Sequence, residues 1–151
     1  MKKTIKGNLI TMSLLGDFDV IIHGQNCFHS WGAGIVKEIA RSYPAAKVAD
    51  LNTKKGDKKK LGTYSSAKIT LNNGKELIVV NAYTQYSYGV KKCHLNDRAL
   101  QEVFQKISVD FEGKKIAYPK IGAGRAGGDW KKISVVIDKE FENIDHTLVV
   151  I

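Results

Sequence analysis

The chain has 151 residues, of which 43% are hydrophobic, and a formal net charge of +9 at pH 7. This length and composition predict one globular domain over residues 1–151, built around a single core. No apolar stretch approaches the ~20 residues of a membrane span, and no continuous hydrophobic run follows the first three residues, so we expect neither a membrane segment nor a signal peptide. The two cysteines form no CxxC pair and no His–Cys cluster with metal-ligand spacing, which favours a reducing, cytoplasmic compartment without structural zinc.

Much of the positive charge lies in one segment between residues 54 and 60. Its five lysines surround Gly56-Asp57, which predicts an exposed loop. Aromatic residues do not alternate with these lysines as base-stacking platforms would, so nucleic-acid binding is not favoured. A solvated surface, or general electrostatic attraction of an anionic ligand, explains the cluster more simply.

Hydrophobic periodicity and turn residues predict strands that alternate with helices. The predicted strands cover residues 3–6, 19–24, 63–71, 76–82, 115–118 and 147–151, and the predicted helices cover 9–15, 33–43, a segment that begins at Pro44, 95–109 and 130–141. Asn8 and either Asn96 or Asp97 are suited to N-cap positions, and Pro44 is suited to the first position of a helix. The sequence Asn72-Asn73-Gly74 predicts the turn of a hairpin.

This order of elements predicts an α/β fold, a three-layer α/β/α sandwich with a mixed central sheet. Ligands of open α/β sheets bind at the carboxyl ends of the strands. Those ends fall next to residues 23–34 and 119–130, and we expect the functional site there.

Residues 119–130 form a glycine-rich loop between a predicted strand and a predicted helix. Its four glycines are Gly122, Gly124, Gly127 and Gly128. Bare backbone N–H groups next to a helix N-terminus favour phosphate or pyrophosphate binding over a purely structural turn. The loop lacks the Gly-Lys-Ser/Thr of a Walker motif. With only one predicted strand after it, the loop also lies too late in the chain for a dinucleotide oxidoreductase.

A second loop of this kind joins the strand at 19–24 to the next helix, and residues 23–35 read H-G-Q-N-C-F-H-S-W-G-A-G-I. It carries two histidines, two amides and a tryptophan beside its glycines. Two strand-to-helix glycine loops, on strands that could be neighbours, predict a cleft that holds a diphosphate from both sides.

The two loops together resemble the macrodomain family of ADP-ribose binders. The motifs that carry this resemblance are Asn26, Gly32-Ala33-Gly34-Ile35 and Ile121-Gly122-Ala123-Gly124. The longer strings His23-x-x-Asn26-Cys27, Ser30-Trp31-Gly32, Tyr43-Pro44 and Gly124 to Trp130 resemble the small stand-alone macrodomains of fungi and bacteriophages that hydrolyse ADP-ribose 1″-phosphate. The resemblance extends from Gly7 to the final strand.

The resemblance implies a ligand, ADP-ribose or ADP-ribose 1″-phosphate, and a set of binding residues. Where the family has an aspartate that accepts from the adenine amino group, this chain has Asn8, whose amide oxygen can also accept. The implied binding residues are Asn8 and Leu9 at the base, Asn26 at the distal ribose, Gly32, Ala33, Gly34 and Ile35 around the diphosphate and distal ribose, Ile121, Gly122, Ala123, Gly124 and Arg125 opposite them, Asn81, Thr84 and Gln85 on the proximal ribose side, and Gln25, Ser30 and Trp31 in the first loop.

The resemblance also implies catalysis by a histidine and an aspartate. His23 is expected to act as general acid or nucleophile, and Asp129 to orient or activate water, without a metal or cofactor. The residue types leave simpler readings open: His23 as a core histidine, Asp129 as an N-cap, and Trp31 as a packing or lid residue. We expect His29 to contact the terminal phosphate or face solvent, Cys27 to be a small buried hydrophobic residue, and His94 and His146 to be structural.

The leading hypothesis is a phosphatase that converts ADP-ribose 1″-phosphate to ADP-ribose and phosphate, and we expect a monomer. One alternative is a hydrolase that removes ADP-ribose from a modified protein or nucleic acid. Another is a non-catalytic ADP-ribose reader. The sequence does not assign the separate roles of His23 and Asp129, the adenine selectivity given Asn8, or the physiological pathway.

Overall fold

The computed structural model describes residues 2–89, 93–124 and 126–151. Its centre is a six-stranded sheet with the strand order β1-β6-β5-β2-β4-β3. The strands are β1 (Lys2–Lys6), β2 (Val20–Gln25), β3 (Tyr64–Thr70), β4 (Glu76–Tyr83), β5 (Lys115–Tyr118) and β6 (Asp145–Val150). Only β3 pairs in the antiparallel sense, through its hairpin with β4, so the sheet is mixed as the sequence predicts.

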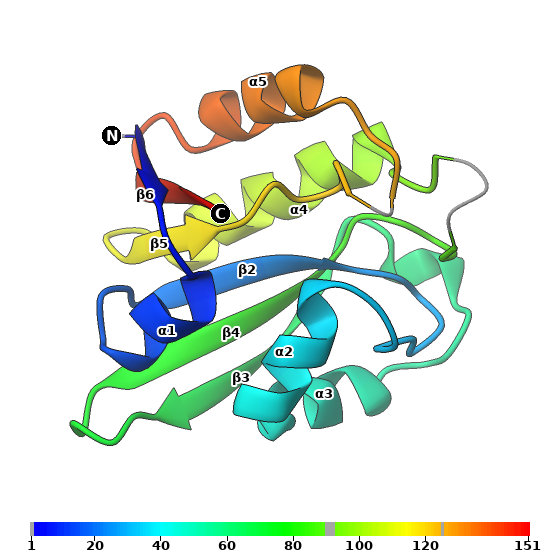
Figure 1. Cartoon of the computed structure of the whole chain (residues 1–151). Helices are drawn as coiled ribbons and strands as arrows, with labels where there is room; N and C mark the ends of the chain where they lie inside the picture. The colour runs from blue at the N-terminus through cyan, green and yellow to red at the C-terminus, as the bar shows by residue number, and fades with distance from the viewer. Residues whose placement is uncertain (1, 90–92, 125) are drawn as a thin grey trace.

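The helices cover both faces of the sheet. They are α1 (Leu9–Leu14), α2 (Ile35–Ser42), α3 (Pro44–Leu51), α4 (Asp97–Asp110) and α5 (Trp130–Glu140). In Figure 1, α4 and α5 lie over one face of the sheet, and α1, α2 and α3 lie over the other. The predicted three-layer α/β/α sandwich is therefore confirmed.

Strand β2 shows how the side chains divide between the two layers. Successive side chains of a strand point to opposite faces. Val20 and Ile22 consequently pack in the core cluster that includes residues of α4 and α5, whereas Ile21 packs in the cluster that includes residues of α1, α2 and α3. The same alternation turns His23 toward the layer of Ile21.

The predicted N-caps and the start of a helix at Pro44 are confirmed. Asn8 caps α1 by accepting a hydrogen bond from the Thr11 backbone N–H at 3.0 Å, and Asn96 caps α4 in the same way from Ala99 at 2.9 Å. Pro44 is the first residue of α3. The helix predicted from residue 33 begins two residues later, because Gly34 has φ 71° and ψ −151°, which no helical residue adopts.

The predicted exposure of the lysine segment holds for four of its lysines and is wrong for Lys60. Lys54, Lys55, Lys58 and Lys59 are exposed, but Lys60 is only 8% exposed, at the end of a 3₁₀ turn (Lys58–Lys60). Its ammonium donates to Thr53 Oγ1 at 3.0 Å and lies 5.0 Å from the centre of the Tyr83 ring. A hydrogen bond and a cation–π contact therefore hold this cation inside, which a linear run of lysines does not indicate.

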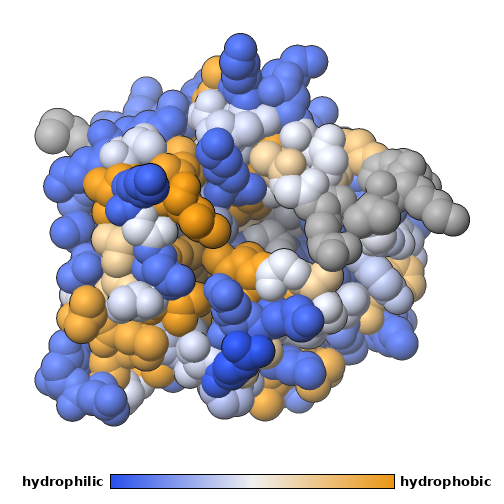
Figure 2. Space-filling model, in the orientation of Figure 1, coloured by the Kyte–Doolittle hydropathy of each residue, from blue (hydrophilic) through white to orange (hydrophobic). Residues whose placement is uncertain are grey.

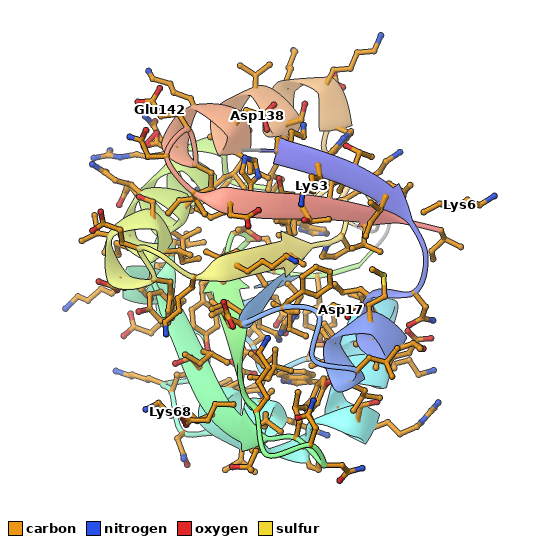
Figure 3. The ribbon with its side chains drawn as sticks, turned by 90° about the vertical axis from the view of Figure 1, so that its left-hand side faces the viewer. Lys3, Lys6, Asp17, Lys68, Asp138 and Glu142 are labelled. Atoms are coloured by element: carbon orange, nitrogen blue, oxygen red, sulfur yellow. The ribbon has the colours of Figure 1, made fainter. Side chains whose placement is uncertain are left out.

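Exposed lysines lie on both edge strands of the sheet. Lys6 on β1 and Lys68 on β3 are exposed, and Figure 3 shows them at opposite sides of the molecule. Charged side chains on edge strands oppose pairing with another sheet. Among the described residues, no helix is both long enough and apolar enough to cross a bilayer.

His146 on β6 is a structural histidine, as predicted. It is 2% exposed, its Nδ1 lies 2.7 Å from the Tyr118 hydroxyl, and the two rings are stacked. Burial lowers the pKa of His146 from 6.5 to about 4. The ring therefore stays neutral in the folded protein at pH values where the unfolded chain binds a proton.

We expect this histidine to make stability depend on pH in a defined window. As the pH falls from 6.5 to 4, the unfolded state takes up a proton that the folded state does not. The free energy of unfolding should therefore fall by up to ~1.4 kcal/mol per pH unit from this residue. Urea unfolding at pH 7, 6 and 5 should show a smaller fall for His146→Gln than for the native chain, and equal falls would contradict the assignment.

Candidate functional site

A cleft of ≈ 790 Å³ opens at the carboxyl ends of the parallel strands. Figure 2 shows a hollow near the centre of this face, bordered by hydrophobic and weakly polar residues. The described residues that line the cleft come from five segments: residues 7–10 after β1, parts of the loop after β2 with the start of α2, residues 85, 88 and 89 after β4, residues 119–124 and 126 after β5, and the end of β6 with residue 151. The pairing of β2 with β5 brings the two glycine loops to the same edge of the sheet, as the sequence predicts.

The glycines of the 119–130 loop fall into two groups, those that the loop conformation requires and one that faces open space. Gly122 and Gly127 have φ values of 76° and 77°, which side-chain-bearing residues rarely adopt. A Cβ at Gly128 would lie 2.7 Å from the Gly122 carbonyl oxygen and 2.8 Å from side chains of Leu95 and Ile133. These three glycines allow the loop to fold tightly. Gly124 differs, because a Cβ there would meet nothing within 4 Å, and like Gly122 it lines the cleft.

The first loop presents its backbone at the start of α2. Ala33, Gly34 and Ile35 line the cleft, and a Cβ at Gly34 would also meet nothing within 4 Å. Asn26 fixes the preceding turn, because its Oδ1 accepts from the Phe28 and Ser30 N–H groups and its Nδ2 donates to the Ser30 carbonyl. Side-chain hydrogen bonds therefore hold the loop at Asn26 and Ser30, which themselves line the cleft.

His23 does not line the cleft. The side chain is fully buried, with Nε2 2.5 Å from Asn81 Oδ1 and Nδ1 3.1 Å from the Gly24 carbonyl oxygen. Burial lowers the pKa of His23 and outweighs these two hydrogen bonds, which favour the protonated ring. The Trp31 ring packs 5.3 Å from it. The structure thus places His23 in the layer beneath the first loop, in the position of a core histidine.

Asp129 is exposed and caps α5 by accepting from the Lys131 backbone N–H at 3.0 Å. It does not line the cleft either. The structure therefore does not bring His23 and Asp129 together there, and their catalytic roles stay predictions. No group of three or more His, Cys, Asp or Glu side chains among the described residues could hold a metal ion.

Comparison with known proteins identifies relatives of the chain. No protein-family model matches it. It is 31% identical over 152 residues to the uncharacterized 17.5 kDa protein in the tk-vs intergenic region of Enterobacteria phage T4, covering 97% of this chain and 94% of the phage protein. The chain belongs to the family of that phage protein.

Solved structures show the fold. The macrodomain of Mycobacterium tuberculosis DarG matches with a TM-score of 0.78 at 16% identity, covering 100% of this chain and 98% of the other. Thermosipho africanus DarTG, solved in complex with ADP-ribose, matches with a TM-score of 0.74 at 13% identity, covering 99% of this chain and 42% of the other. The chain has the macrodomain fold.

Most of the predicted binding residues of this chain reach the cleft, and some do not. Those that line it are Asn8, Leu9, Asn26, Ser30, Ala33, Gly34, Ile35, Gln85, Ile121, Gly122, Ala123 and Gly124. Gln25, Trp31, Gly32, Asn81 and Thr84 do not line it, and Arg125 lies outside the described residues. Gln25 and Asn81 fail to reach the cleft because their strand positions turn their side chains into the layer of His23.

Cys27 and His29 of the first loop make contacts outside the cleft. Cys27 is fully buried, as predicted, and burial raises the pKa of its thiol to about 11, which keeps it protonated. His29, which we expected at a phosphate or in solvent, instead has its Nε2 2.9 Å from the Thr53 carbonyl oxygen. It does not line the cleft.

The structure adds lining residues that the sequence did not indicate. Lys120 and Glu38 supply charges, Tyr88 supplies an exposed ring, and Val149 and Ile151 supply an apolar wall. Lys120 lies within the 119–130 loop and Glu38 lies four residues after Gly34, so the sequence did carry a signal for both. Val149 and Ile151 carried no such signal, because they reach the cleft through the pairing of β6 with β1 and β5.

We expect alanine at two glycines of the 119–130 loop to have opposite effects on stability. Gly128→Ala should lower the free energy of unfolding by about 1–3 kcal/mol, because the new methyl group overlaps backbone and two packed side chains. Gly124→Ala should be neutral or slightly stabilising, because its Cβ meets open space. Thermal unfolding measures both, and equal melting temperatures would show that Gly128 is not closely packed.

Proposed function

We propose that this macrodomain binds ADP-ribose in the cleft and hydrolyses ADP-ribose 1″-phosphate to ADP-ribose and inorganic phosphate. The observation that carries the proposal is the pair of glycine loops that meet across the cleft, with open space in front of Gly34 and Gly124. Such backbone leaves room for a diphosphate and offers it N–H donors. A volume of ≈ 790 Å³ is within the range of small-molecule sites. The similar DarTG structure in complex with ADP-ribose supports the choice of ligand.

We place the adenine at the end of the cleft formed by β1 and β6. Leu9, Val149 and Ile151 supply apolar surface there. Asn8 lines the same end, and its oxygen already accepts from the Thr11 N–H, although an amide oxygen has a second lone pair. Glu38 also lines this side and borders a smaller neighbouring hollow that Asn8 shares. This arrangement leaves the glycine loops for the diphosphate.

The chemistry we propose rests mainly on positioning. The loops would fix the diphosphate, so that the 1″-phosphate meets water in a constant orientation. Backbone N–H groups would stabilise charge on the phosphoryl oxygens. The departing sugar oxygen needs a proton, which we assign to His23, and the attacking water needs orientation, which we assign to Asp129. For His23 to act, its buried ring has to gain access to the cleft and bind a proton, because burial lowers its pKa.

A second function, an ADP-ribose reader without turnover, is favoured by a specific observation. The described residues that line the cleft include no histidine, and Glu38 is the only carboxylate among them. A reader needs only the binding surface. Release of ADP-ribose from a modified protein or nucleic acid would use the same surface with a different leaving group.

Gly124→Glu tests the binding site. The carboxylate would enter the space proposed for the diphosphate and repel it, so we expect ADP-ribose affinity to fall by at least about 100-fold in calorimetry. Gly124→Ala controls for the added Cβ, and Val135→Glu controls for the added charge, because Val135 is exposed on α5 and does not line the cleft. Unchanged affinity in folded Gly124→Glu would remove this loop from the site.

Phosphate release from ADP-ribose 1″-phosphate with EDTA present tests the reaction. We expect the native chain to turn over, and His23→Ala and Asp129→Ala to lower kcat by about 100-fold or more, with ADP-ribose affinity kept within about tenfold. Asp129→Ser is the matched control, because serine retains an N-cap without a carboxylate.

The outcomes separate the proposals. A serine variant with full turnover would make Asp129 a cap only, and full turnover in all three variants would refute this mechanism. ADP-ribose binding without any turnover in the native chain would leave the reader.

A further inference from the structure

A buried carboxylate lies directly beneath the first glycine loop. Asp50 on α3 is fully buried. Its Oδ2 accepts a hydrogen bond from the Trp31 indole Nε1–H at 2.7 Å, and its Oδ1 accepts from the Tyr83 hydroxyl at 2.6 Å. One oxygen therefore holds the loop and the other holds strand β4.

This arrangement is not explained by stability alone. A buried carboxylate loses its hydration, and apolar residues of similar volume often stabilise a core as well or better. Among the described residues, no cation lies within 4 Å of Asp50: the nearby Lys60 ammonium bonds to Thr53 and faces the Tyr83 ring. Two neutral donors satisfy the carboxylate. The Asp50 carboxylate therefore differs from an apolar residue in that its two hydrogen bonds fix the orientation of the Trp31 indole and the Tyr83 hydroxyl.

The hydrogen bond to Trp31 affects the cleft because of where Trp31 lies in the chain. Trp31 is followed by the exposed Gly32 and then by Ala33 and Gly34, which line the cleft. Gly34 is the N-cap of α2, and because glycine has no side chain it cannot fix the start of the helix by a capping hydrogen bond. On the other side of Trp31, Gln25 and Asn26 both donate to the Ser30 carbonyl. The hydrogen bond from Trp31 to Asp50 is therefore the side-chain contact that fixes the stretch 31–34.

We propose that Asp50 is a positioning residue for the site: through Trp31 it holds the backbone of residues 33–35 where that backbone can bind the diphosphate of ADP-ribose. The inference rests on the proposed binding function. Asp50 itself does not line the cleft. Its action passes through the indole N–H and the short segment that follows Trp31.

Trp31→Phe tests the proposal, because phenylalanine keeps an aromatic ring over His23 and removes the donor to Asp50. We expect ADP-ribose affinity to fall about tenfold, while the affinity for adenosine, which lacks the diphosphate, stays unchanged. Tyr83→Phe is the matched control. It removes the other donor to the same carboxylate from β4, together with the contacts of that hydroxyl to Ser65 and Thr53, so it should cost at least comparable stability and leave both affinities unchanged.

Asp50→Asn provides the conservative rescue. The asparagine oxygen can still accept from Trp31, whose indole is only a donor, and the Tyr83 hydroxyl can turn to accept from the amide. We therefore expect this variant to bind ADP-ribose within about twofold of the native chain, whereas Asp50→Leu, which removes the acceptor, should lose about tenfold and tests the role if Trp31→Phe does not fold.

Three results would overturn the positioning role. They are unchanged ADP-ribose affinity in Trp31→Phe, an equal loss for adenosine, and an equal loss in Tyr83→Phe. Failure of the native chain to bind ADP-ribose would instead refute the proposed function itself.

Discussion

The parallel pairing of β2 with β5 is the constraint on which the site depends. Val20 pairs with Ile116 and Ile21 with Ala117, so the two strands run side by side and their carboxyl ends lie next to each other. Each strand then leaves through a glycine loop. Because both loops begin from neighbouring strands that point the same way, their backbones face each other across one cleft. The two loops therefore face each other without long side chains that reach across the cleft.

The alternation of side chains along β2 separates residues that line the cleft from residues buried beneath it. Gly24 lines the cleft, whereas His23 and Gln25 on either side of it are buried. Side chains that alternate along a strand cannot all serve the same surface. A motif read as a string joins His23 and Asn26 in one site, but β2 turns His23 into the core, whereas Asn26, just after the strand, lines the cleft.

The layer beneath the first loop is unusually polar for a core. His23 bonds to Asn81, Asn81 donates to the Ala46 carbonyl, and Asp50 accepts from Trp31 and Tyr83. Buried hydrogen bonds of this kind are directional, and they restrict a loop to one arrangement more strongly than apolar contacts do. The binding backbone is thereby supported from below by side chains that we do not expect to touch the ligand.

The sequence by itself determined the α/β/α layers, the hairpin at 72–74, the caps at Asn8 and Asn96, and the two glycine loops, because each of these depends on local patterns that neighbouring residues carry. Only the tertiary structure decided which residues reach the cleft. Val149 and Ile151 enter through pairing with distant strands, Lys60 is drawn inside by Thr53 and Tyr83, and Trp31 is turned inward by Asp50. Those outcomes depend on contacts between residues far apart in the chain, which no local pattern encodes.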